Sequence, residues 1–165
     1  MARKRNILIH HVNEDKLKRF GQLLRLPADE GKKPDFESDI ITFYGQLGLL
    51  SCEGPTEFGI CTYKKRALTI EHLEQHGNTQ ELLYAIDDDF IIPVAPPLNN
   101  APDLDNMVAI RVHRSEGIIF EKGIWHWVPY PLKDESFALV GFAKDTAKND
   151  LVVFDLDEQI VMVTE

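Results

Sequence analysis

The sequence has little cysteine, and its hydrophobic runs are short. Only two of its 165 residues are cysteine, Cys52 and Cys61, which is too few for the disulfide framework of a small secreted domain. We expect both thiols to be reduced, buried and structural. No apolar run approaches the roughly 20 residues of a membrane-spanning helix, and Ile7–Ile9 is too short for the core of a signal peptide. These absences predict a cytoplasmic protein that does not enter a membrane.

Positive charge is also scarce. The chain has 27 acidic and 18 basic side chains, which gives a net charge of −9. Nucleic acid and anionic membranes repel such a chain, so neither is an expected partner. An anionic small molecule would need a local cationic pocket that works against the overall field. Hydrophobic content of 44% and charged content of 27% are those of an ordinary globular protein, and the length suits one domain over residues 1–165.

Short strand-like stretches alternate with turn residues along most of the chain, which predicts an all-β sandwich or barrel. One helix is indicated near the N-terminus: Asn13 is a good N-cap, and Leu17, Phe20 and Leu24 follow helical spacing up to Pro27. A turn near residues 53–56 predicts that two of the strands form a hairpin, namely Leu47–Cys52 and Phe58–Tyr63. The other predicted strands are Asn6–Val12, Ile40–Tyr44, Glu81–Ile86, Phe90–Val94, Met107–Arg114, Ile118–Phe120, Trp127–Leu132, Phe137–Phe142, Leu151–Phe154 and Gln159–Val163.

The densest group of metal-ligating and acid–base residues lies in residues 68–80. If this stretch is a strand, Ile70, His72, Glu74 and His76 share one face, which starts apolar and becomes polar. Such a strand would run from a packed core to the mouth of a cavity. A second segment would complete the site. The best candidate is the segment with His126, which stands between two tryptophans.

A helix is the competing interpretation of the same stretch. His72 and His76 have the i, i+4 spacing of zinc-binding helices in hydrolases, but Leu73 stands where that motif has its general base. The helix would also be short and would end at Gly77. We therefore favour the strand.

The order of these groups resembles the cupin pattern, in which His-x-His is followed after three or four residues by Glu and much later by another His. Here the order is Glu74-x-His76, then Gln80, then His126. Glu74 replaces the first His and Gln80 replaces the Glu, and both keep a donor atom that can bind a metal.

Two segments more specifically resemble the ureidoglycolate lyase family, a branch of the cupins. The first is Leu68–His76 with Thr79-Gln80 after it, and the second is Gly117–His126, a Gly-x-x-aromatic-x-x-Gly-x-Trp-His run. The resemblance covers Leu68–Pro131 and is weaker in the N-terminal strand–helix unit.

This resemblance implies a fold, an activity and a site. The fold is a cupin-like double-stranded β-helix (jelly-roll) barrel with one short N-terminal helix. The activity is cleavage of ureidoglycolate to glyoxylate and urea in the breakdown of allantoin and purines, by a homodimer with Trp127 near its interface. We assign Glu74, His76 and His126 to catalysis. The expected ligands of a divalent metal are Glu74, His76, Gln80 and His126.

The identity of the metal stays open. Mixed nitrogen and oxygen ligands suit nickel, manganese, iron or zinc. Because Gln80 supplies no negative charge, a metal-free anion site is an alternative. A cationic side chain should pair with the substrate carboxylate. The candidates are Lys64, Arg66, Arg111 and Lys122, of which Lys122 is preferred because it is close to His126 in sequence.

A second function is kept beside the lyase: a cupin that binds or isomerises a sugar or another small carboxylate. Two departures from the family favour it. Phe120 stands where the family often has Tyr, and the spacing from His76 to Gln80 is one residue shorter. His10 and His11 have no partner in sequence and are expected to be structural.

Overall fold

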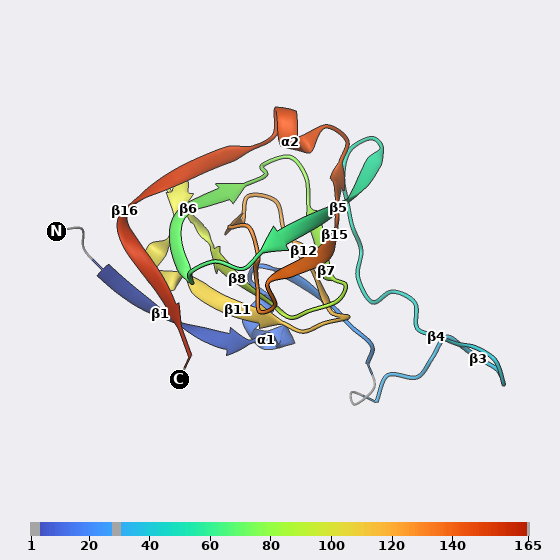
Figure 1. Ribbon diagram of the computed structural model, residues 1–165. Helices are drawn as coiled ribbons and strands as arrows, with labels where there is room; N and C mark the ends of the chain where they lie inside the picture. The colour runs from blue at the N-terminus through green and yellow to red at the C-terminus, as the bar shows by residue number, and fades with distance from the viewer. Residues whose placement is uncertain (1–3, 28–30, 165) are drawn as a thin grey trace.

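The computed structural model describes residues 4–27 and 31–164, and nearly all of its regular structure is β (Figure 1). Seven strands form a large sheet in the order β11-β1-β16-β6-β13-β8-β14, and β11 also pairs with β8, so this sheet closes into a barrel. Five strands form a second sheet in the order β2-β12-β7-β15-β5. The predicted cupin-like double-stranded β-helix is therefore confirmed.

The strands of the large sheet are β1 (Lys4–His11), β6 (Thr69–Gln75), β8 (Phe90–Ala95), β11 (Val108–Val112), β13 (Trp125–His126), β14 (Tyr130–Pro131) and β16 (Val152–Val163). Those of the second sheet are β2 (Gly21–Leu24), β5 (Thr56–Lys64), β7 (Glu81–Ala85), β12 (Gly117–Phe120) and β15 (Glu135–Ala143). Two small pairs are β3 (Phe36–Glu37) with β4 (Thr42–Phe43), and β9 (Pro97–Leu98) with β10 (Ala101–Pro102). The helical turns are α1 (Glu14–Leu17), η1 (Leu104–Asn106) and α2 (Thr146–Asn149).

Both faces of β8 are buried, because the strand lies between two apolar clusters. Ile92 and Val94 point into the cluster that the two sheets share, whereas Ile91 and Ala95 point into the cluster on the other face of the large sheet. This explains why β8 is a continuous apolar run rather than an alternating one. The first cluster has the candidate site at its margin, because it contains Phe120, whose ring stacks on His126.

The predicted N-terminal helix begins as expected but is much shorter. The Asn13 side chain accepts a hydrogen bond from the Lys16 backbone N–H, which confirms the N-cap. The helix ends at Leu17, and the predicted extension to Leu24 is wrong, since residues 21–24 form β2 against β12. A Cβ at Gly21 would lie 2.0 Å from the Ile119 carbonyl oxygen, so the missing side chain permits this close approach.

The predicted hairpin of Leu47–Cys52 with Phe58–Tyr63 is also wrong. Residues 47–52 form no strand, and β5 pairs with β15 instead. The two cysteines are free as predicted, but they are half-buried rather than buried.

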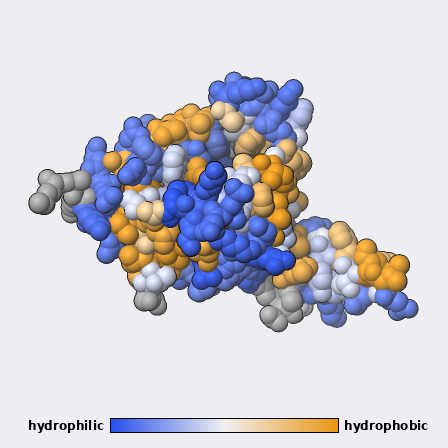
Figure 2. Space-filling model, in the orientation of Figure 1, coloured by the Kyte–Doolittle hydropathy of each residue, from blue (hydrophilic) through white to orange (hydrophobic). Residues whose placement is uncertain are grey.

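Residues 32–45 form an arm that projects from the barrel (Figure 1) and contains the β3–β4 hairpin. The tip of this arm is apolar in Figure 2. Ile40 is 94% exposed, and Phe36, Ile41 and Phe43 are each more than half exposed. Within the described residues, no helix is long and apolar enough to cross a membrane.

Gly21→Ala should destabilise the fold, because its Cβ would clash with the β12 backbone. We expect a loss of about 3 kcal/mol or more, which corresponds to a fall in Tm of roughly 6–12 °C for a domain of this size. Thermal unfolding followed by circular dichroism measures it. Gly59→Ala is the matched control, because no atom lies within 4 Å of a Cβ built there on β5. Equal Tm values for the two variants would contradict the explanation.

Candidate functional site

Four side chains from three strands converge at the edge of the shared apolar cluster. Glu74 lies on β6 directly opposite His126 of β13, His76 follows the end of β6, and Glu81 is the first residue of β7. The Glu81 Oε2 atom lies 3.1 Å from His76 Nε2 and 3.0 Å from His126 Nε2. The Glu74 Oε1 atom is 3.9 Å from His126 Nε2. We call these four residues the His–Glu cluster.

Backbone carbonyl groups orient both imidazoles. His76 Nδ1 lies 2.6 Å from the Asp150 carbonyl oxygen, and His126 Nδ1 lies 3.1 Å from that of Ile124. Because a carbonyl oxygen only accepts, each Nδ1 carries a proton, and each Nε2 faces Glu81. Phe120 supports the second ring by stacking on His126 with a centroid distance of 4.8 Å.

The loop that contains His76 is held by a single carboxylate. The Asp150 side chain accepts hydrogen bonds from the backbone N–H groups of Gly77 and Asn78, at 2.9 and 2.8 Å. On the other side, the Gly123 N–H donates to the His76 carbonyl oxygen at 2.7 Å. The position of His76 is therefore fixed from two separate parts of the chain.

Mutual attraction outweighs burial for three of the four groups. Burial by itself would lower the pKa of His76, but its hydrogen bond and charge interaction with Glu81 raise it to about 9. Burial likewise opposes the charge of His126, but the Glu81 carboxylate keeps its pKa above the usual range. Burial would raise the pKa of Glu81, but the charges and contacts of the two histidines lower it to about 2.

Glu74 behaves differently from its neighbour. Burial raises the pKa of its carboxyl group, and the opposing charge of His126 offsets this only in part. Glu74 is also more open, since its side chain is 20% exposed against 5% for His126. It is therefore the member of the cluster best able to exchange a proton with a bound molecule.

The cluster fits a divalent metal ion. Ligand atoms of Glu74, His76 and His126 all lie within 4.8 Å of one another. The 3.0 and 3.1 Å contacts of Glu81 equal the spacing of about 3.0 Å between adjacent ligands around an ion bound at about 2.1 Å. Glu81 Oε2 and His126 Nε2 are buried without a hydrogen bond of good geometry, as expected of atoms that share a cation.

The structure brings together three of the four residues predicted as ligands. Glu74, His76 and His126 meet in the cluster, but both ends of the Gln80 amide are used elsewhere. Its Oε1 accepts from the Ser51 N–H at 2.6 Å, and its Nε2 donates to Glu121 at 2.8 Å.

Sequence reasoning missed Glu81, which is the central member of the cluster. A signal was present: four residues separate His76 from Glu81, and this is the spacing of His and Glu in the cupin pattern. Choosing Gln80 as the equivalent of the cupin Glu hid that match.

His72 lies outside the cluster, although it was expected on the same strand face. Its Nδ1 is 2.7 Å from Asp155 Oδ1, and its ring packs near Trp127. The alternative of a zinc-binding helix with His72 and His76 is wrong, because β6 is a strand. Trp125, the neighbour of His126 on β13, is 1% exposed and lies in the core.

Two of the predicted carboxylate-binding cations have other partners. Arg66 lies over the Tyr130 ring and donates to the carbonyl groups of Val128 and Pro129. Arg111 makes an ion pair with Asp89 at 2.8 Å. Among the predicted cations, Lys122 is the nearest in sequence to His126. It directly precedes Gly123, whose N–H donates a hydrogen bond to the His76 carbonyl oxygen.

Together, the barrel and its His–Glu cluster define a cupin with a candidate centre for a divalent metal. The family model described as ureidoglycolate lyase matches residues 4–163, essentially the whole chain. The chain belongs to the ureidoglycolate lyase family, which confirms the resemblance seen in the sequence.

A search of curated proteins finds no match. Solved structures match at low identity. The chain aligns over 72% of its length with 70% of a dTDP-4-dehydrorhamnose 3,5-epimerase from Elizabethkingia anophelis, with 12% identity and a TM-score of 0.47. It aligns over 61% of its length with oxalate decarboxylase from Bacillus subtilis, a protein with Mn(II) centres, with 15% identity and a TM-score of 0.42. Our chain spans 24% of that decarboxylase.

Metal binding should depend on Glu81 and not on Gln80. We expect Glu81→Gln and His126→Ala to weaken the binding of Mn²⁺, Ni²⁺ or Zn²⁺ by at least about 100-fold, and Gln80→Ala by less than about threefold. Isothermal titration calorimetry on metal-stripped protein measures these affinities. Equal losses for Glu81→Gln and Gln80→Ala would contradict the geometry.

The same affinity should rise with pH. The pKa of His76 in the metal-free cluster is about 9, so a metal ion must displace its proton at lower pH. We expect tighter binding at pH 9 than at pH 7, with protons released to the buffer. Calorimetry in two buffers of different ionisation enthalpy tests this, and a proton release of zero at pH 7 would contradict it.

Proposed function

We propose that this protein is a metal-assisted ureidoglycolate lyase that forms glyoxylate and urea. The observation that carries the proposal is the Glu81 carboxylate shared by the Nε2 atoms of His76 and His126. The family match over residues 4–163 supplies the substrate class. The same family membership supports a role in allantoin breakdown in the cytoplasm.

The chemistry requires one proton to move. Ureidoglycolate carries a hydroxyl group, a carboxylate and a ureido nitrogen on one carbon. The hydroxyl group loses its proton, the C–O bond becomes the aldehyde of glyoxylate, and the C–N bond breaks with its electron pair on nitrogen. The departing nitrogen then gains a proton and leaves as urea. A single group that accepts and returns a proton satisfies this balance.

We assign Glu74 to that proton transfer. It is the most open member of the cluster, and its raised pKa brings its proton affinity closer to neutral pH. Glu81 is unsuited, because its side chain is more buried than that of Glu74 and its charge is committed to two histidines. His76, Glu81 and His126 are left as the proposed metal ligands. A divalent ion there would lower the pKa of the substrate hydroxyl group and attract the substrate carboxylate.

Two neighbours complete the proposed site. Lys122, in the turn held against the His76 carbonyl oxygen, is proposed to pair with the substrate carboxylate. Phe120 holds the His126 ring by stacking, so a tyrosine hydroxyl group at this position is not required for that support. Arg66 and Arg111 are not assigned to substrate, because both are bound elsewhere.

The test separates catalysis from metal binding. Urea and glyoxylate release from racemic ureidoglycolate is measured on metal-stripped protein and after Mn²⁺, Ni²⁺ or Zn²⁺ is restored. We expect Glu74→Gln to lower turnover by about 10²–10⁴-fold while metal affinity changes little, because it removes the proton carrier. Glu81→Gln should lose both turnover and metal.

His72→Ala is the control on the same strand, because His72 contacts Asp155 rather than the cluster. It should keep turnover within about threefold of the original protein. Absence of turnover with every metal, from folded protein, would overturn the lyase and leave a cupin that binds a different sugar or carboxylate.

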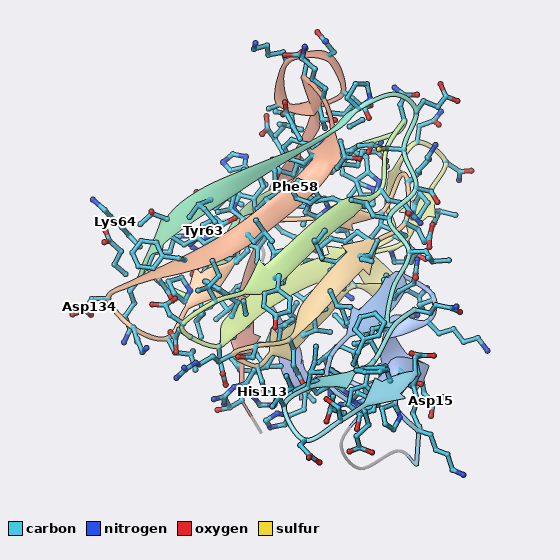
Figure 3. All side chains as sticks on the ribbon, turned by 90° about the vertical axis from the view of Figure 1, so that its right-hand side faces the viewer. Asp15, Phe58, Tyr63, Lys64, His113 and Asp134 are labelled. Carbon is cyan, nitrogen blue, oxygen red and sulfur yellow. The ribbon has the colours of Figure 1, made fainter. Side chains whose placement is uncertain are left out.

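We also propose a homodimer held by the projecting arms. A hairpin with two-residue strands is too small to be stable alone. Its Ile40 and Phe43 are exposed, and so are Phe58 and Ile60 on β5, of which Phe58 is labelled in Figure 3. The arm of one copy would cover this face of a second copy. Exposed apolar surface of this kind often marks an interface.

Light scattering during size-exclusion chromatography tests the arm. We expect a mass of two chains, and a mass of one chain for the double variant Ile40→Ser with Phe43→Ser. Leu98→Ser with Leu151→Ser removes two exposed apolar side chains outside the arm and should leave the dimer intact. One chain in the original protein would contradict the dimer, and a dimeric arm variant would contradict the role of the arm.

A further inference from the structure

A cavity lies between α1 and the strands β1 and β11, and it shares no residue with the His–Glu cluster. Its volume is about 570 Å³, within the range of small-molecule sites. Val108 and Ile110 of β11 form an apolar floor beside His10, which pairs in register with Ile110. The rim consists of Asp15, Lys16, Lys18 and Arg19. Asp15 marks this rim in Figure 3, below the five-stranded sheet.

The rim is cationic although the chain as a whole is acidic. Three permanently positive side chains face one carboxylate here, whereas the whole chain carries a charge of −9. Within residues 4–27 and 31–164, no hydrogen bond or ion pair uses the side chains of Lys16 or Lys18. Their charges are therefore free to attract an anion.

Arg19 is held in place before any ligand arrives. Its Nη2 donates to the Asn106 carbonyl oxygen at 3.1 Å, and its guanidinium group lies 4.6 Å from the centre of the Phe20 ring. A guanidinium group has five N–H donors, so this contact leaves others available. The helix below is fixed by its Asn13 cap and by Leu17, which is 1% exposed. Less ordering is therefore needed when a carboxylate binds.

We propose that this cavity binds a small organic monocarboxylate with an apolar body. The carboxylate lies against Arg19 and the two lysines, and the apolar body lies on Val108 and Ile110. Asp15 on the rim disfavours anions of higher charge, such as free phosphate. The site is independent of the lyase chemistry, since none of its residues belongs to the cluster or its supports.

Three probes with the same phenylbutyl body test the charge requirement: 4-phenylbutyrate, 4-phenylbutanol and 4-phenylbutylamine. Calorimetry should show one saturable site per chain for the acid, binding of the alcohol at least about tenfold weaker, and no binding of the amine. The full chain is used with its metal restored. Equal affinities for acid and alcohol would overturn the proposal, because the cavity would then be only an apolar surface.

Charge reversal locates the site. Lys16→Glu with Lys18→Glu should weaken 4-phenylbutyrate binding at least about tenfold. Lys64→Glu with Lys65→Glu makes the same change of net charge at the end of β5, away from the cavity. This variant should bind 4-phenylbutyrate within about twofold of the original protein. Both lysine pairs are exposed, so Tm should not change, and lyase turnover should be unchanged in the Lys16 and Lys18 variant.

Equal losses in the two double variants would overturn the proposal, because the effect would then come from net charge alone. Binding that occurs only after Ile40→Ser with Phe43→Ser would also overturn it. In that case the arm of a second copy, rather than a small carboxylate, occupies the cavity.

Discussion

The buried carboxylate of Glu81 is the constraint on which the candidate site depends. A charge at this depth is tolerated only when partners compensate for the lost water, and here the partners are two imidazoles at 3.0 and 3.1 Å. The three residues come from the end of β6, the start of β7 and β13. Their attraction therefore requires both sheets to be assembled, and each imidazole must also find its carbonyl acceptor. The same atoms therefore hold the two sheets together and form the candidate site.

The two apolar clusters explain why the site is rigid. His126 lies beside Trp125, which is buried in one cluster, and its own ring stacks on Phe120 from the other. A shift of β13 would disturb both sets of contacts at once. The open member, Glu74, faces the fewest such restraints, and it is the residue to which we assign the moving proton. The packed His126 and the more open Glu74 are therefore neighbours on paired strands.

The all-β class was accessible from local alternation and turn spacing, and the cupin barrel and most of the cluster from the resemblance to the ureidoglycolate lyase family. The strand that leads to His76 and the Asn13 cap follow from these rules and agree with the structure. The wrong predictions of secondary structure are those that depend on backbone contacts between residues far apart in the sequence. Nothing local shows that Gly21 must fit against the Ile119 carbonyl oxygen, or that β5 pairs with β15 rather than with residues 47–52.

Side-chain partners were the least predictable feature. Gln80 and Glu81 are adjacent, and only the tertiary structure shows that Gln80 binds Ser51 and Glu121 while Glu81 faces the histidines. Similarly, the charge of Arg111 gave no indication that Asp89 would take it. Spacing indicates which part of the chain supplies a ligand, but which of two adjacent residues faces the site depends on the sheet face that each one occupies.

The pairing of β1 with β16 has a consequence for synthesis of the chain. These strands are parallel and lie side by side, although they come from opposite ends of the sequence (Figure 1). During translation, the barrel cannot close until residues 152–163 have left the ribosome, so the edge of β1 that faces β16 stays unpaired while all the residues between these two strands are made. Contacts of such long sequence separation fold slowly and expose edges to aggregation. We infer that the nascent chain, rather than the finished barrel, is the state in which this protein most needs a chaperone.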